Sequence, residues 1–119
     1  MSDERFPKEQ RLRKTREFRH VEKNKIARIK TEHLIILVAP NHTAGTRIGI
    51  TASKKVGKAV RRNRVKRLLR ECYRKNKTLF TPGYDYVLIA KPGLEQAGYS
   101  DIYHEIAEAL KTDTWQKKS

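Results

Sequence analysis

Residues 54–71 read KKVGKAVRRNRVKRLLRE, and this stretch combines an apolar stripe with a dense positive charge. From Lys58 onward, a step of 100° per residue gives a helix with two unlike faces. One face holds Val65, Leu68, Leu69, Cys72 and Asn76, and the opposite face holds Arg67, Arg70 and Arg74. Arg61 and Arg62 stand one turn before Val65, where core residues would be expected. The pattern predicts a helix that packs along one side and whose first turn projects beyond the core.

The segments around this helix have the composition of strands and turns. Short β-rich runs cover 26–29, 33–39 (HLIILVA), 47–53 (RIGITAS) and 85–90 (DYVLIA). The stretches PNHTAGT and TPGYD supply turn residues before the third and fourth runs. A period of two in RIGITAS places Ile48, Ile50 and Ala52 on one face. These runs predict a small sheet with the basic helix between its third and fourth strands.

Two further amphipathic segments predict helices nearer the ends of the chain. Thr15 is a possible cap, and Phe18 and Val21 follow it at i and i+3, which indicates a helix over 15–23. Ser100 can cap a last helix. One face of that helix holds Ile102, Ile106, Ala109 and Leu110.

The resulting order, αβββαβα, predicts an α+β sandwich of about four strands and three helices. We expect the helices to lie against one face of the sheet, with the basic helix connecting two strands. Residues 11–114 are expected to form a single domain, flanked by flexible tails at 1–10 and 115–119.

The positive charge of the chain is concentrated in one place. The 119 residues carry a net charge of +15, and twelve of the 28 Lys and Arg lie in 54–77, where Glu71 is the one acid. Such a patch is typical of proteins that bind nucleic acid or an anionic membrane. A single cysteine, Cys72, excludes an internal disulfide and favours a reducing compartment, so we expect a cytoplasmic protein. The longest apolar run, LIILVA, is too short to cross a bilayer.

Phosphate is the anion that the basic helix fits best. A helix face that only faces solvent normally mixes charges at i and i+4, whereas here Glu71 is the one internal acid. Arginine matches phosphate oxygens with two parallel hydrogen bonds. Asn63 can bond a base edge or a ribose hydroxyl, or it is a polar residue in an exposed turn. A helix on a membrane surface is disfavoured, because it would need leucines that the core requires. A leucine-zipper basic region is also disfavoured, because no heptads follow and Pro82 and Gly83 end the helix soon afterwards.

The stretch also resembles the signature of the protein subunit of bacterial ribonuclease P. The matching residues are Lys54, Lys55, Gly57, Ala59, Val60, Arg62, Asn63, Arg64, Lys66, Arg67 and Arg70. The likeness extends to RLRKTREFRHV (11–21), RIGITASKK (47–55) and GYDYVLIA (83–90). It implies a fold like domain 2 of ribosomal protein S5, in which the helix joins two parallel strands by an uncommon left-handed crossover.

The resemblance also implies two RNA-binding surfaces. The basic helix is expected to bind the catalytic RNA subunit through Lys58, Arg61, Arg62, Asn63, Arg64, Lys66, Arg67, Arg70 and Arg74. A cleft between the sheet and the first helix is expected to bind the single-stranded 5′ leader of precursor tRNA through Arg11, Arg13, Phe18, Ile36, Lys54 and Lys55. Phe18 can stack on a base or belong to the core. Glu22 and Ile36 stand where many relatives have aromatic residues, which reduces stacking.

No catalytic group stands out among the protein side chains. His20, His33, His42 and His104 are scattered, and the shared helical face of Asp101, Glu105 and Glu108 is ordinarily a solvated one rather than a metal site. The resemblance implies that the RNA subunit and substrate bind most of the Mg²⁺ and that the holoenzyme removes the 5′ leader. No protein partner is evident. The alternative is a ribosomal or other structural RNA-binding protein without a processing role.

Overall fold

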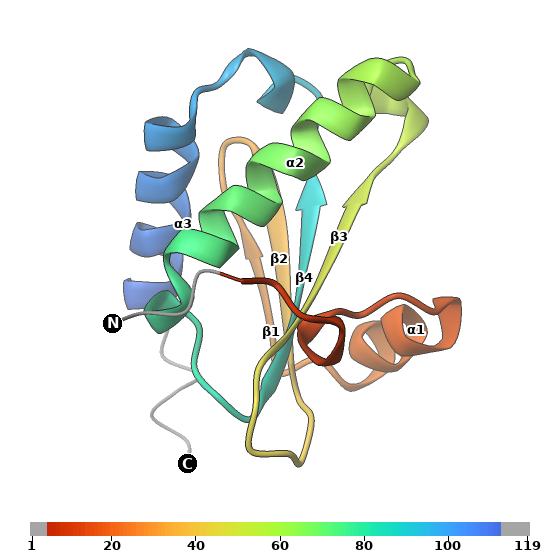
Figure 1. Cartoon of the computed structure of the whole chain (residues 1–119), viewed down its shortest axis with the longest axis vertical. Coiled ribbons are helices and arrows are strands. Elements are labelled where there is room, and N and C mark those ends of the chain that lie inside the picture. Colours follow the sequence, from red (N-terminus) through yellow and green to blue (C-terminus); the bar gives the residue numbers. More distant parts are fainter. Residues whose placement is uncertain (1–4, 113–119) are drawn as a thin grey trace.

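The computed structural model describes residues 5–112, which form a four-stranded sheet and three α-helices (Figure 1). The strands are β1 (Ala27–Lys30), β2 (Leu34–Pro40), β3 (Arg47–Ala52) and β4 (Tyr84–Ala90). The helices are α1 (Thr15–Asn24), α2 (Ala59–Lys75) and α3 (Tyr99–Thr112). Short 3₁₀ turns are η1 (Lys8–Gln10), η2 (Lys54–Val56), η3 (Lys77–Leu79) and η4 (Leu94–Gln96). The predicted order αβββαβα is confirmed.

The sheet is mixed, with the strand order β1-β2-β4-β3. β2 pairs antiparallel with both β1 and β4, whereas β3 pairs parallel with β4. The connection from β3 to β4 runs through α2. With α2 in front of the sheet and both strands pointing up, the chain passes from β3 on the right to β4 on its left, which is the left-handed sense (Figure 1).

The larger core lies between the sheet and two of the helices. Val65 and Leu69 of α2 and Ile102 and Ile106 of α3 pack against sheet residues that include Leu88. The predicted packing stripes of both helices are confirmed, and Tyr73 of α2 joins them as a residue that the stripe did not include. Asn76 is the C-cap of α2 and not a core residue.

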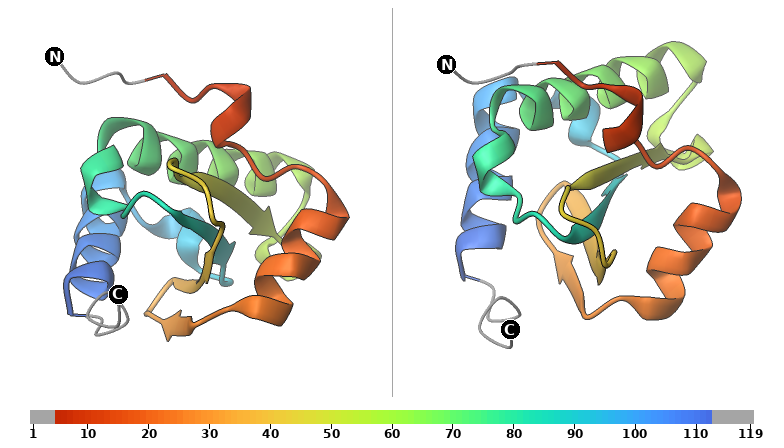
Figure 2. Two further views of the ribbon diagram at one scale, coloured as in Figure 1. Left: turned by 90° about the horizontal axis from the view of Figure 1, so that it is seen from below. Right: turned by 60° about the horizontal axis from the view of Figure 1, so that its bottom comes forward.

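The expectation that all helices lie on one face of the sheet is wrong. α1 covers the other face, where Val21 packs with Leu12, Leu37 and Val87 in a second core cluster (Figure 2). The unbroken apolar run of β2 carries the signal for this arrangement, because a strand covered on both faces is apolar at successive positions. Leu34 and Ile36 to Ala39 are all buried.

The N-terminal arm, residues 5–14, is also more ordered than the predicted tail over 1–10. Phe6 packs against Tyr73 of α2 with ring centroids 5.0 Å apart, and the hydroxyl of Tyr73 donates to Oε1 of Gln10 over 2.9 Å. The N–H of Leu12 donates to the carbonyl of Ile48, so the arm crosses the free edge of β3. These contacts tie residues of the predicted tail to α2 and β3. The expected C-terminal tail and residues 1–4 lie outside the described residues.

The helix starts differ from the expected caps. α1 begins at Thr15 itself, and Glu17 performs the capping, because its Oε1 accepts the N–H groups of Arg13 and Lys14 over 2.9 and 2.8 Å. These bonds, from Lys14 first, lower the pKa of Glu17. α3 begins one residue before Ser100. Between residues 5 and 112, no helix has the length and apolar character to span a bilayer.

Candidate RNA-binding site

The exposed side of α2 carries cations that no acid of residues 5–112 neutralises. Arg61, Arg64, Arg67 and Arg70 are exposed, as are Asn63 and the N-cap Lys58. Among the described residues, the ion pairs of α2 join Arg74 and Lys75 to Glu71, over 2.8 and 3.5 Å. We call Lys58, Arg61, Asn63, Arg64, Arg67 and Arg70 the α2 surface. The structure brings these predicted residues together, whereas predicted Arg74 is engaged with Glu71.

Two of the predicted residues lie on the flank of α2 toward its buried side. Arg62 and Lys66 are half-buried, about two turns and one turn ahead of Arg70, respectively. The Nε of Arg62 is shielded from solvent and has no hydrogen-bond partner among residues 5–112.

The backbone before α2 positions its first turn. Gly57 has φ = 144°, a region that residues with a Cβ rarely adopt, and the aliphatic part of Arg61 lies over its Cα. A Cβ at Gly57 would come within 2.8 Å of Cδ of Arg61. Val60, in the same turn, is 73% exposed. The first turn projects from the core as the sequence predicts. Because Gly57 has no Cβ, the side chain of Arg61 can pack directly against its backbone.

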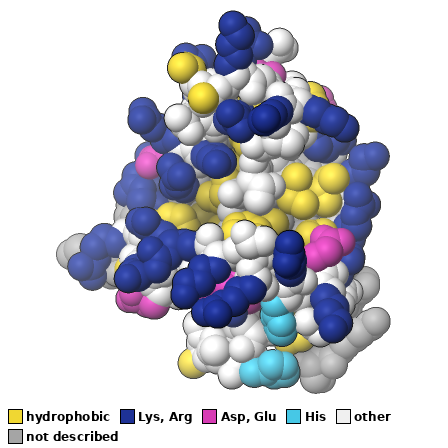
Figure 3. Space-filling view, turned by 90° about the vertical axis from the view of Figure 1, so that its right-hand side faces the viewer, with side chains coloured by type: hydrophobic (Ala, Val, Ile, Leu, Met, Phe, Trp, Pro, Cys, Tyr) yellow, Lys and Arg dark blue, Asp and Glu magenta, His cyan; other side chains and the backbone are white. Residues whose placement is uncertain are grey.

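An apolar cleft lies between α1 and the sheet. It has a volume of about 280 Å³ and is lined by Thr15, Phe18, Arg19, Glu22, Leu37, Thr51, Val87 and Ile89. Figure 3 views the molecule from the side of α1 and β3, where hydrophobic side chains form a band among Lys and Arg. The predicted Phe18 lines this cleft, and its ring also packs on Gly49, where a Cβ would come within 2.6 Å. Phe18 is thus both a core residue and a cleft residue.

The prediction that Ile36 lines the cleft is wrong. Ile36 is fully buried in the core under α2 and α3, where it pairs with Leu88. Because successive side chains of a strand point to opposite faces, its neighbours Ile35 and Leu37 face α1 instead. The residue of β2 that lines the cleft is Leu37, one position after Ile36.

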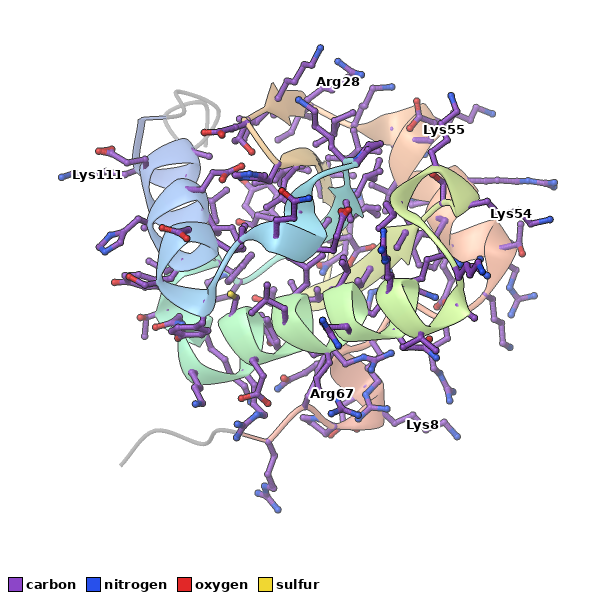
Figure 4. All side chains as sticks on the ribbon, turned by 90° about the horizontal axis from the view of Figure 1, so that it is seen from above. Lys8, Arg28, Lys54, Lys55, Arg67 and Lys111 are labelled. Carbon is purple, nitrogen blue, oxygen red and sulfur yellow. The ribbon has the colours of Figure 1, made fainter. Side chains whose placement is uncertain are left out.

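The predicted cations of the cleft lie around it rather than in it. Arg11 and Arg13 line a separate groove beside α2. Lys54 and Lys55 extend from η2, at the end of the molecule where α2 begins (Figure 4). Glu22 lines the cleft as an acid, although its carboxylate pairs with Nζ of Lys25 over 3.1 Å.

A network of charged groups holds α1 beside the sheet. Asp85 of β4 is fully buried and accepts from Arg47 of β3 and from Nδ2 of Asn41, the latter over 3.0 Å. Nη1 of Arg47 lies 3.6 Å from the capping carboxylate of Glu17. The hydrogen bonds to Asp85 raise the pKa of Arg47, so the guanidinium keeps its charge. Sequence reasoning missed this network, although an aspartate at the start of an apolar strand is a signal for a buried partner.

A larger hollow, of about 670 Å³, lies between the β1–β2 turn and α3. Its acidic lining comprises Glu32, Asp101, Glu105 and Glu108. Glu105 accepts from the N–H of His33 over 2.6 Å and bonds its ring Nδ1 over 2.8 Å, so it ties the turn to the helix. In the described part of the chain no three His, Cys, Asp or Glu side chains are placed to hold a metal ion. This acidic side is a poor surface for RNA.

The left-handed β3–α2–β4 unit, the unneutralised α2 surface and the cleft beneath α1 together define a basic, RNA-binding α+β protein. Comparison with known proteins identifies its family. The family model for ribonuclease P matches residues 6–113, so the chain belongs to the ribonuclease P protein family. It is a protein component of ribonuclease P, the endoribonuclease holoenzyme that processes tRNA.

Individual relatives agree with this membership. The chain is 45% identical over 106 residues to the ribonuclease P protein component of Geotalea uraniireducens, covering 89% of this chain and 92% of the relative. The corresponding protein of Citrifermentans bemidjiense is 41% identical over 110 residues, with 92% and 93% covered. The structure of the RNase P protein from Thermotoga maritima superimposes with a TM-score of 0.77 at 31% identity, over 87% of this chain and 96% of that one. Family membership favours a processing subunit over the ribosomal alternative.

Proposed function

We propose that the α2 surface binds the catalytic RNA and that the apolar cleft binds the single-stranded 5′ leader of precursor tRNA. The observation that carries the first part is the set of exposed arginines without acid partners in residues 5–112. The free energy cost of such like charges falls when a polyanion neutralises them. The second part is supported by Phe18, whose partly exposed ring can stack on a base irrespective of its sequence.

In this proposal the protein assists cleavage and carries no catalytic group. Mg²⁺ is bound mainly by the RNA subunit and the substrate, and the protein screens phosphate repulsion so that metal and substrate bind more tightly. We also propose that the protein is cytoplasmic, because a chain with one cysteine, Cys72, has no internal disulfide and suits a reducing compartment. Burial raises the pKa of the Cys72 thiol to about 12, which makes the thiol unreactive.

Reconstitution tests the proposal. The protein is added to its catalytic RNA at low Mg²⁺, and cleavage of precursor tRNA is compared with the RNA alone. We expect stimulation by the wild type. We expect Arg64→Gln on the α2 surface to bind the RNA about 1–3 kcal/mol more weakly, the range for a lost charged hydrogen bond. The control is Arg28→Gln, an exposed arginine of β1 on the opposite side of the molecule from α2 (Figure 4). Equal binding by the two variants would remove the α2 surface from the interface.

A further inference from the structure

A groove separates the N-terminal arm from α2. Phe6, Arg11, Leu12, Arg13, Ile48, Ile50 and Arg70 line this arm groove, whose volume is about 430 Å³. Arg11 and Arg13 come from the arm, Arg70 comes from α2, and β3 supplies the two isoleucines of the floor. In Figure 4 the arm runs beside α2, with Lys8 and Arg67 on the same side of the molecule. Residues nearly 60 positions apart in the sequence therefore share one small basic site.

Arg11 is held in position before any ligand arrives. Its Nε donates to the carbonyl oxygen of Phe6 over 2.8 Å, and its guanidinium lies 4.9 Å from the centroid of the Phe6 ring. Phe6 is in turn packed on Tyr73. The bond uses one of the five N–H groups of Arg11, which leaves its terminal nitrogens for a ligand. An arginine fixed in this way loses less conformational entropy when it binds.

The groove attracts anions and offers no internal partner for its charges. No acid is among its lining residues, and Arg11, Arg13 and Arg70 form no ion pair within the part of the chain that the structure describes. The nearby carboxylate of Glu17 is engaged by the N–H groups of Arg13 and Lys14. The apolar floor limits competing water, which strengthens a charged hydrogen bond above it.

We propose that the arm groove holds one phosphodiester group of an RNA strand between Arg11 and Arg13 on one wall and Arg70 on the other. The proposal rests on the proposed binding of RNA at the α2 surface, because Arg70 belongs to both. It adds the N-terminal arm as an RNA-binding element and joins the arm to α2 through a shared phosphate. Either the catalytic RNA or the precursor tRNA can supply this group.

A double-mutant cycle tests whether the two walls hold the same phosphate. Affinities are measured for Arg11→Gln, Arg70→Gln and the double variant, with Arg28→Gln as the control. We expect each single variant to bind roughly ten- to a hundredfold more weakly, the range for a charged hydrogen bond. The double variant should lose much less than the product of the two single losses, because the second substitution acts on a contact already broken. Fully multiplicative losses, or losses no larger than that of Arg28→Gln, would overturn the shared site.

The ligand in each measurement identifies the source of the phosphate. One series uses the catalytic RNA alone. A second uses the assembled holoenzyme with precursor tRNA and with mature tRNA. Coupled losses in the first series assign the group to the catalytic RNA, and coupled losses with precursor tRNA but not mature tRNA assign it to the leader. Absence of coupling in both series rejects the proposal.

The free protein provides a readout that does not depend on the holoenzyme. Inorganic pyrophosphate should raise the melting temperature of the wild type and of Arg28→Gln by mass action. The rise should be smaller in Arg11→Gln and Arg70→Gln, and an equal rise in all four proteins would count against the groove. If Arg64→Gln leaves RNA binding intact while the groove variants still lose the pyrophosphate effect, the proposed function fails and the anion site stands.

Discussion

Arg47 and Asp85 meet through two parallel hydrogen bonds, 2.8 Å from Nε to Oδ1 and 2.7 Å from Nη2 to Oδ2. The two residues lie directly opposite each other on the parallel strands β3 and β4. The carboxylate is fully buried, while the arginine reaches the surface and the cap of α1. The pair therefore links the β3–β4 crossover to the helix that forms one wall of the apolar cleft.

We expect Arg47→Met to lower the free energy of unfolding by about 3 kcal/mol, because Asp85 is left buried without its charge partner. This value is at the lower end of the usual range, since the side chain of Arg47 is 31% exposed and solvent screens part of the interaction. Urea denaturation measures the change. Arg28→Met is the matched control, and an equal midpoint for the two variants would show that the pair contributes little.

The capping carboxylate of Glu17 predicts a loss of stability in acid. Its pKa is lowered in the folded protein from the ordinary value of 4.5, by the N–H bonds of Lys14 and Arg13 and by Arg47. A carboxyl with a depressed folded pKa stabilises the protein above its unfolded pKa, and that contribution is lost as the pH falls through the folded pKa. We expect the free energy of unfolding to fall below about pH 4.5 and Glu17→Gln to flatten that fall. Parallel pH profiles for wild type and variant would contradict the assignment.

Substitutions of Phe18 can distinguish its proposed stacking on RNA from its packing in the protein core. Phe18→Ala should weaken precursor tRNA binding by about 1–3 kcal/mol, the usual value for one stacked base, and leave mature tRNA binding unchanged. It should also lower the melting temperature, because the ring packs on Gly49. Phe18→Leu keeps most of the packing and removes the aromatic face. Precursor affinity at the wild-type level in the leucine variant would assign Phe18 to the core alone.

Substitution of Gly57 by alanine should lower both the stability of the protein and its affinity for RNA. Gly57→Ala places a Cβ at φ = 144° and against the stem of Arg61, at a cost of about 1–3 kcal/mol. Arg61 must then move, so binding of the catalytic RNA should weaken as well. Gly45→Ala is the control, because a Cβ at Gly45 meets nothing within 4 Å. Similar unfolding midpoints for the two alanine variants would argue against a conformational requirement at Gly57.

The structure departs from the sequence-based expectations in two places. One is which face of β2 each side chain occupies, and the other is the packing of the N-terminal arm. HLIILVA is apolar at nearly every position, so the run predicts a buried strand but does not tell which side chain faces which helix. The family resemblance places Ile36 in the cleft, whereas in the structure it faces α2 and α3. The polar arm before Leu12 has no periodicity, and its order comes from contacts of Phe6 and Gln10 with Tyr73, more than 60 residues away.

The sequence by itself determined the helices, the strands, their order and the basic face of α2, because helical and strand periodicities are local properties of the chain. Its signature residues also indicated the family and, through it, the left-handed crossover. Only the tertiary structure decided that α1 covers the second face of the sheet, that Arg47 pairs with Asp85, and that Arg11 and Arg70 face one groove. These relationships depend on the packing of segments distant in sequence, which local periodicity does not specify.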